Sequence, residues 1–304
     1  MELETYFAEK GWTIAFRESR PARQGEFFAF KDLGLSDFSL RVLDGFDQGL
    51  YQHQREGISR YLSGSNLAVT TSTASGKTLI FNVCALEELA RHANSRIVAV
   101  YPLRALASEQ TDRWAQVLKQ AGIQARVGRI VGGVPQQDRL RILKESRVVV
   151  MTPDIIHTWL FSSLASPPIL DFLRNLSLVI IDEAHTYSGV FGSNSAFLFR
   201  RLLHACRKLG AHVRFIASSA TMLDPEAHLA RLSGEHFEVV GPELDSSPRS
   251  AILTLLADPP KTKDMLTVLS DLIAYAATET QHQSIILLIA ANRPSISRPS
   301  LTDA

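Results

Sequence analysis

Short apolar runs rich in β-branched residues alternate with helical stretches from residue 67 onward, and this alternation constrains the fold most. The runs are continuous, as in strands that are buried on both faces of a parallel sheet. Strands that alternate with helices are typical of a doubly wound α/β fold. We therefore expect a mostly parallel sheet flanked by helices, with strands at 67–70, 97–101, 127–131, 148–151, 178–181 and 213–217 and helices at 103–121, 135–145, 154–165 and 189–209.

The segment 71–78, Thr-Ser-Thr-Ala-Ser-Gly-Lys-Thr, lies between the first of these strands and a helical pattern at 79–90. A strand, a loop of small residues and a helix form a phosphate cradle, because loop N–H groups and the helix N-terminus point at the ligand. Lys77 is expected to reach the β- and γ-phosphates, and the Thr78 hydroxyl to bind Mg²⁺. Thr71 stands where such loops usually have their first glycine, so a turn without a ligand is the alternative. The other loop residues expected at the nucleotide are Thr73, Ala74, Ser75 and Gly76.

A second polar cluster, Asp182-Glu183-Ala184-His185, directly follows the strand expected at 178–181. Ligands of doubly wound sheets bind beyond the carboxyl ends of the strands, where this cluster and the loop would meet. Asp182 is expected to bind Mg²⁺, and Glu183 to polarise the water that attacks the γ-phosphate. A solvated turn or a helix N-cap is the alternative for an acidic pair alone, but the preceding phosphate loop favours the catalytic interpretation.

Together these segments resemble the first motor domain of superfamily 2 helicases of the DEAD/DEAH-box type, over about residues 54–221. The resemblance implies a RecA-like P-loop NTPase fold, ATP and Mg²⁺ as cofactors, and hydrolysis coupled to movement on single-stranded nucleic acid. Gln54 matches the glutamine that reads adenine in that family; an exposed glutamine at a helix start is the alternative. Ser219-Ala220-Thr221 matches a motif whose two hydroxyls bridge to the acidic cluster, including His185, and link nucleotide state to domain closure.

The same resemblance implies a nucleic-acid track from three segments that each follow an expected strand. Glycines allow close approach to a phosphate, and helix N-termini and hydroxyls bind phosphates without reading bases. Arg104 and Arg129 are the best candidate cations, and Asp154 is expected to act mainly as the N-cap of its helix. A solvated surface charge or a structural turn is the alternative for each residue. The track comprises Pro102, Arg104, Arg129, Gly132, Gly133, Thr152 and Asp154.

Three stretches, at 73–77, 101–107 and 185–193, resemble bacterial and yeast DNA-repair helicases related to the mitomycin-repair factor. That branch implies single-stranded DNA as the partner, with RNA as the alternative. Its members also carry a cysteine-rich, zinc-binding C-terminal domain. The corresponding cysteines do not occur in this sequence.

Three segments are expected: an N-terminal extension at 1–45, a RecA-like ATP-binding domain at 46–241, and a remainder at 242–304. The remainder would hold a linker, a helix at 261–279, the truncated start of a second RecA-like domain with a strand at 285–289, and a disordered tail. The second domain of the family supplies arginine fingers, and no Gln-x-x-Gly-Arg-x-x-Arg pattern occurs here. Because an arginine finger is worth ~10³–10⁵ in turnover, we expect slow hydrolysis by this chain alone. The alternatives are a partner chain that supplies the second domain, a non-catalytic half-motor or regulatory module, and a translocase subunit of a defence system.

Composition adds few constraints. The net charge of +1 does not exclude a nucleic-acid partner, because basic groups can line a single groove. Cys84 and Cys206 lie in helical apolar patterns and are expected to be reduced core thiols. The N-terminus lacks a signal-peptide pattern, and no apolar run approaches the ~18 residues of a membrane span. We expect a cytoplasmic protein with no membrane partner.

Overall fold

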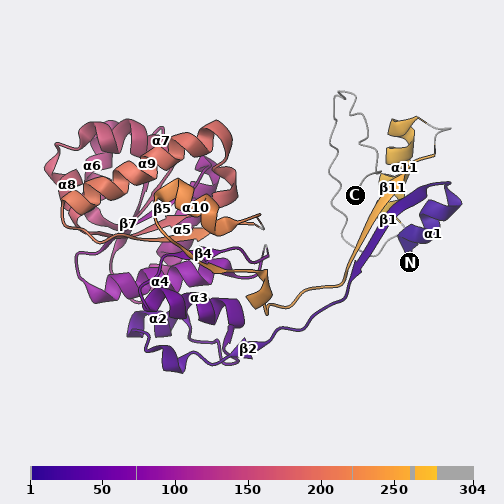
Figure 1. Cartoon of the computed structure of the whole chain (residues 1–304), viewed down its shortest axis with the longest axis horizontal. Coiled ribbons are helices and arrows are strands. Elements are labelled where there is room, and N and C mark those ends of the chain that lie inside the picture. The colour runs from indigo at the N-terminus through magenta and orange to yellow at the C-terminus, as the bar shows by residue number, and fades with distance from the viewer. Residues whose placement is uncertain (1, 73, 221, 261–263, 279–304) are drawn as a thin grey trace. The chain divides into compact units, whose positions relative to one another are not determined.

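The structure, a computed structural model, describes residues 2–72, 74–220, 222–260 and 264–278 (Figure 1). Contacts within the chain divide it into two units. The larger unit is Arg23–Arg249, and the smaller one joins Met1–Ala22 to Ser250–Ala304. Every motif residue singled out from the sequence belongs to the larger unit.

A seven-stranded sheet forms the centre of the larger unit. Its strands lie in the order β10-β4-β9-β8-β5-β7-β6, and every neighbouring pair is parallel. This confirms the parallel, doubly wound α/β architecture. The edge strand β10 was not expected, because it begins with Glu238 and only its last two residues form an apolar run. The strands are β4 (Leu67–Val69), β5 (Arg96–Val100), β6 (Arg126–Ile130), β7 (Ser146–Met151), β8 (Leu176–Ile181), β9 (Arg214–Ser218) and β10 (Glu238–Val240).

Helices cover both faces of this sheet (Figure 1). Successive strand residues point to opposite faces, so Val98 packs in one apolar core and Ile97 in the other. Cys84 and Cys206 are both free and buried, as expected. One face carries α2 (Asp37–Val42), α3 (Gln52–Leu62), α4 (Lys77–Arg91) and α5 (Arg104–Gln120); the other carries α6 (Gln136–Glu145), α7 (Pro153–Ile155), α8 (Pro167–Arg174), α9 (Gly189–Lys208) and α10 (Pro225–Ser233).

The boundary expected at residue 45 differs from the one in the structure, because residues 23–45 pack within the larger unit. β2 (Phe27–Phe28) pairs with β3 (Leu50–Tyr51). The buried Glu87 carboxylate of α4 accepts hydrogen bonds from the Ser36 backbone N–H at 2.9 Å and the Ser39 hydroxyl at 2.5 Å. These bonds satisfy a buried charge, and a helical apolar pattern gives no sign of them.

The smaller unit pairs two ends of the chain that the sequence places far apart. β1 (Thr13–Arg20) is antiparallel to β11 (Ile252–Asp258). The rings of Tyr6 in α1 (Glu2–Glu9) and Tyr275 in α11 (Met265–Thr278) stack with centroids 4.1 Å apart. The expected helix at 261–279 is therefore present as α11, whereas the strand at 285–289 and the tail lie outside the described residues. The assignment of this region to a second RecA-like domain stays a prediction.

Candidate nucleotide site and nucleic-acid track

The phosphate loop joins β4 to α4 and is closed by contacts within itself. The Lys77 ammonium donates to the carbonyl oxygens of Thr71 and Ser72, both at 2.8 Å. The Thr71 hydroxyl, in place of the usual glycine, lies 2.8 Å from the Ser75 hydroxyl. Gly76 caps α4 at φ 86°, a left-handed conformation that favours glycine. The loop therefore keeps the backbone turn and helix N-terminus of a phosphate cradle despite Thr71.

Three carboxylates act on the Lys77 ammonium in the phosphate loop. Burial lowers the pKa of Lys77, and the carboxylates of Glu183, Asp182 and Asp245 act in the opposite direction. Thr78 follows in the first turn of α4 with an exposed side chain. Mg²⁺ in nucleotide sites is held by one or two protein oxygens together with water and phosphates, so Thr78 and Asp182 fit this ion. Of the expected loop residues, Thr73 lies outside the described residues.

The first residues of α3 form hydrogen bonds with the backbone of the phosphate loop. The His53 Nε2–H donates to the Ser75 carbonyl at 3.0 Å, and the Gln54 amide donates to the Gly76 carbonyl at 3.1 Å. The Gln54 carbonyl oxygen accepts the Tyr51 backbone N–H at 3.1 Å. Both ends of the Gln54 side chain therefore bind backbone groups here, and its adenine-reading role stays a prediction. His53 was missed because a lone buried histidine carries no sequence signal.

The acidic cluster begins where β8 ends. The Asp182 N–H donates to the Val100 carbonyl of β5 at 3.1 Å, and the Asp182 carboxylate accepts the Glu183 N–H at 3.0 Å. Glu183 has φ 52°, a conformation that side-chain-bearing residues rarely adopt. This turn leaves the Glu183 side chain 42% exposed, with its carboxylate 3.3 Å from His185 Nδ1. A water-accessible carboxylate near the phosphate loop has the access that activation of water requires.

The hydroxyl contacts of the acidic cluster differ in part from those expected. The Ser219 hydroxyl lies 3.4 Å from His185 Nδ1, so this contact to the histidine is present. The carboxylate of Asp182 also accepts a short hydrogen bond from Ser218, the last residue of β9, which was not expected. Thr221 lies outside the described residues. Ser218 was missed because the family motif starts one residue later.

The proposed track residues lie at the same carboxyl edge of the sheet as the nucleotide elements. Pro102 and Arg104 follow β5, Gly132 and Gly133 follow β6, and Thr152 follows β7, in three strands that are neighbours in the order β5-β7-β6. A Cβ on Gly132 would overlap the Arg104 guanidinium, and Gly133 has φ 103°. The left-handed φ favours glycine at Gly133, whereas the exposed, flexible Arg104 side chain could move away from a larger residue at Gly132. The segments of Arg104 and Gly132 are in contact.

Thr152 and Asp154 do not have the positions that were expected at the start of α7. Thr152, which is buried, occupies the N-cap position of α7, and Asp154 sits within the first turn, so the N-cap role expected of Asp154 is wrong. The helix expected at 154–165 is present as one continuous helical segment that changes type, from α7 through a π-helical stretch (Ile156–Leu160) to a 3-10 helical turn (Phe161–Ser163). The Arg129 guanidinium donates to the Ser108 hydroxyl and remains exposed.

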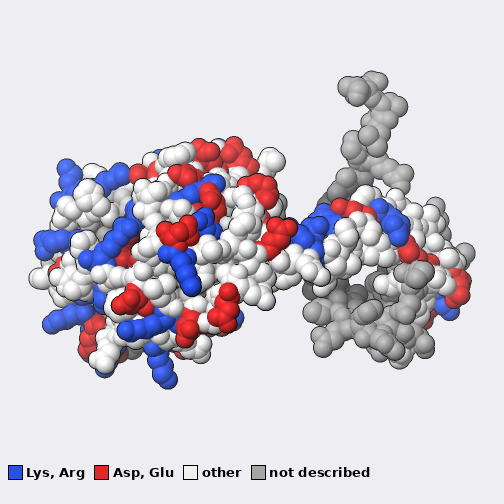
Figure 2. All heavy atoms as spheres, turned by 90° about the horizontal axis from the view of Figure 1, so that it is seen from below, with Lys and Arg blue, Asp and Glu red and all other residues white. Residues whose placement is uncertain are grey.

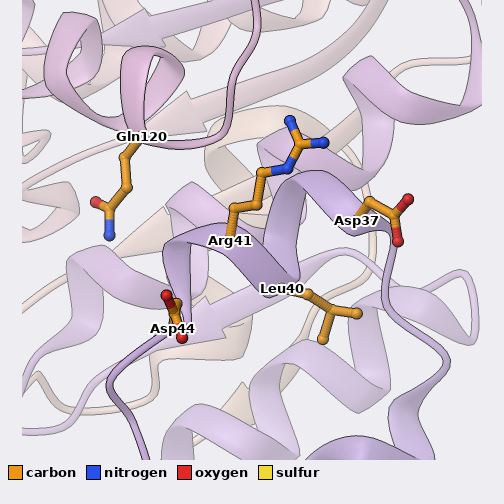
Figure 3. Close-up of a pocket in the computed structure, with 5 residues that line it drawn as sticks. All are labelled: Asp37, Leu40, Arg41, Asp44 and Gln120. Carbon is orange, nitrogen blue, oxygen red and sulfur yellow. The ribbon is translucent and has the colours of Figure 1, made fainter.

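The surface of the larger unit also carries mixed charges and a hollow that is unrelated to the candidate site. Figure 2 shows basic side chains interspersed with acidic ones over the visible face of the larger unit. A hollow of about 570 Å³ between α2 and the end of α5 contains no motif residue (Figure 3). Arg41 there donates to the Ala121 carbonyl at 3.1 Å, and Gln120 donates to the Val42 carbonyl at 3.3 Å. These bonds join two helices, which makes the hollow a structural junction.

A different hollow, of about 430 Å³, borders the track. Asp154 lines it together with the exposed rings of Phe191 and Phe197 in the first half of α9.

Within the residues that the structure describes, no helix is both long and apolar enough to cross a membrane.

Comparison with known proteins gives a consistent result. The DEAD/DEAH box helicase family matches residues 51–229, more than half of the chain. An uncharacterised ATP-dependent helicase of Methanocaldococcus jannaschii, MJ1574, is 30% identical over 83% of this chain and 37% of its own length. The ATP-dependent helicase HRQ1 of Saccharomyces cerevisiae is 34% identical over 70% of this chain.

This chain spans only 37% and 20% of the lengths of those two relatives. Among solved structures, the DUF1998 helicase MrfA bound to DNA superposes on 90% of this chain and 39% of its own, with a TM-score of 0.80 and 25% identity. The sequence match, the parallel sheet and the motif residues at its carboxyl edge agree. The chain belongs to the DEAD/DEAH box helicase family.

Proposed function

We propose that the chain is the ATP-binding motor domain of a DNA helicase or translocase, in which ATP hydrolysis drives movement along single-stranded DNA. The arrangement of one sheet edge carries this proposal. Nucleotide-type elements follow β4, β8 and β9, and phosphate-binding-type elements follow the adjacent strands β5, β7 and β6. Binding at one half of such an edge can alter the other half through the sheet, in which β8 and β5 are neighbours.

Lys77 and Glu183 carry the central chemical roles. Lys77 would exchange its two loop carbonyls for the β- and γ-phosphates, beside the N-terminus of α4. Thr78 and Asp182 would hold Mg²⁺, which neutralises phosphate charge when bound. Glu183 would orient and polarise the attacking water. His185 lies within 3.4 Å of both Glu183 and Ser219, so movement of the carboxylate would reach the end of β9.

The choice of DNA is supported by likeness to known DNA helicases. The solved helicase MrfA, which is similar over 90% of this chain, is bound to DNA. The elements at Arg104, Gly132 and Thr152 would hold the sugar-phosphate backbone and would not select base sequence. The exposed rings of Phe191 and Phe197 offer a surface on which unpaired bases can stack.

A second RecA-like domain would complete the site, either in a longer form of the chain or in a partner. The charged groups that act on Lys77 in the described structure are three carboxylates. Cations that stabilise the transferring γ-phosphoryl group would then come from the second domain. We therefore expect this chain to bind ATP and to hydrolyse it slowly when alone.

The deciding experiment is ATP turnover by the 304-residue chain with and without a single-stranded oligonucleotide, as DNA and as RNA, alongside a direct measurement of ATP binding. Turnover stimulated more by DNA supports a DNA motor. ATP binding with negligible turnover identifies a half-motor that needs its second domain. Absence of ATP binding contradicts the proposal.

Replacement of Arg104 by alanine should weaken binding of single-stranded DNA whatever its base sequence. Because the variant would neutralise one phosphate fewer, the slope of log affinity against log salt concentration should also fall by about 1. Fluorescence anisotropy with a labelled oligonucleotide measures both quantities. Arg113→Ala is the matched control, because Arg113 lies farther along α5 and pairs with the exposed Glu109. Equal affinities and slopes for the two variants would remove Arg104 from the track.

A further inference from the structure

The segment Gly241 to Arg249, here named the exit segment, leads out of the larger unit and contacts the phosphate loop. It follows β10, the strand beside β4, and its last residue pairs with Arg23. Arg23 and Arg249 exchange two backbone hydrogen bonds of 2.9 Å each. Since Arg23 begins the larger unit and Arg249 ends it, both chain connections to the smaller unit start from this one pair.

Asp245 is the centre of the exit segment. Its carboxylate is almost fully buried and accepts hydrogen bonds from the Ser247 hydroxyl at 2.6 Å and the Ser247 N–H at 3.0 Å. The Arg23 guanidinium lies 3.4 Å from the same oxygen, Oδ1. The other oxygen, Oδ2, accepts the hydroxyl of Ser72 in the phosphate loop at 2.5 Å. Burial acts to raise the pKa of Asp245, but the hydrogen bonds from Ser247 and Ser72 outweigh it and lower this pKa.

The Asp245 carboxylate lies near His53 but makes no hydrogen bond with it. Its Nε2 is bound to the Ser75 carbonyl, and its buried Nδ1, without a hydrogen-bond partner, lies 3.7 Å from Asp245 Oδ1. In this tautomer a lone pair faces a carboxylate, and burial lowers the pKa of His53 although Asp245 acts to raise it. The contacts that hold Asp245 are therefore those to Ser72, Ser247 and Arg23.

We propose that Asp245 is a positioning residue that ties the phosphate loop to the exit segment, so that nucleotide in the loop alters the paired connections at Arg23 and Arg249. The inference rests on the proposed function. Lys77 binds the Ser72 carbonyl while Asp245 binds the Ser72 hydroxyl. When Lys77 turns to phosphates, Ser72 loses one of its two anchors and Asp245 holds the other. The state of the loop is thereby passed to the exit segment through one hydrogen bond.

The test is a double-mutant cycle on the dissociation constant of a non-hydrolysable ATP analogue with Mg²⁺. Asp245→Ala and Ser72→Ala should each weaken binding by up to about tenfold, the value for one charge-assisted hydrogen bond, because this bond is the anchor that Ser72 keeps once Lys77 has turned to the phosphates. The double variant should bind no more weakly than Asp245→Ala alone, since that variant already lacks the bond to Ser72. Glu243→Gln is the control. It removes an exposed carboxylate of the exit segment that accepts a hydrogen bond from the Gly241 N–H, within the segment itself, and so leaves the bond to the phosphate loop intact.

Amide hydrogen exchange on the full chain distinguishes this inference from a purely structural role of Asp245, because a structural role predicts no change of exchange in the exit segment when nucleotide binds. In the unaltered chain the analogue should change exchange at 241–249 and at 23–28, and Ser72→Ala should abolish that change while nucleotide still binds at raised concentration. Additive effects on affinity, or an unchanged exchange response in the variant, would overturn the inference. If Asp245→Ala fails to fold, Ser72→Ala alone decides, because it removes one hydroxyl. Absence of nucleotide binding by the unaltered chain contradicts the proposed function, whereas binding without any response at 241–249 contradicts this inference alone.

Discussion

Lys77→Ala is expected to weaken ATP binding by about a hundredfold or more, because hydrogen bonds to charged groups contribute about 1.5–3 kcal/mol each and Lys77 would make several to the phosphates. In the described structure the ammonium bridges two loop carbonyls, at Thr71 and Ser72. Its removal empties no apolar core, and the Lys77 bond to the Ser72 carbonyl is exposed, while the bond to the buried Thr71 is partly buried. The fold should therefore remain, and isothermal titration with ATP and Mg²⁺ measures the loss of affinity.

Lys119→Ala controls for the loss of one positive charge, because Lys119 is exposed in the last turn of α5. It should bind ATP as the unaltered chain does. Thermal unfolding of both variants completes the comparison. If Lys77→Ala unfolded cooperatively at lower temperature while keeping its affinity for ATP, Lys77 would be a structural residue and the phosphate-loop assignment would fail.

The parallel sheet could be predicted because its strands are buried on both faces and read as continuous apolar runs. The three residues of β10 escaped that criterion, and so did β1 and β11. The last two form an exposed antiparallel pair whose partners lie at opposite ends of the chain. Pairing over that separation leaves no local pattern, so the contacts that join residues 1–22 to 250–304 could only come from the structure.

The placement of the motif residues at strand ends was predictable because their chemistry requires particular side chains after particular strands. Their supporting contacts were not, as two positions show. Ser218, which lies next to the expected Ser219 and was not singled out, binds the Asp182 carboxylate. Thr152 takes the N-cap position expected of Asp154. In each case a neighbouring residue of similar chemistry is available, and the direction of the backbone at the strand end decides between them.

Glu183→Gln should leave ATP binding intact and lower turnover by roughly 10²–10⁴, the usual contribution of a positioned general base. Glutamine has the same shape but cannot take a proton from water. The substitution also removes the charge that faces His185 Nδ1 at 3.3 Å. Because both side chains are about two-fifths exposed, this exposed pair adds little to folding stability. Phosphate release in a single turnover, with DNA present, measures the effect even when the overall rate is slow.

A second glutamate–histidine pair in the same unit provides the control for this substitution. Glu226 lies 3.2 Å from His236 Nδ1, and both side chains are exposed. Glu226→Gln removes a similar charge from a similar pair at a place where no motif residue lies, and turnover should not change. Equal rates for both variants and the unaltered chain would show that Glu183 does not orient the attacking water. A loss confined to Glu183→Gln, with ATP affinity retained, would separate water activation from nucleotide binding and assign it to this carboxylate.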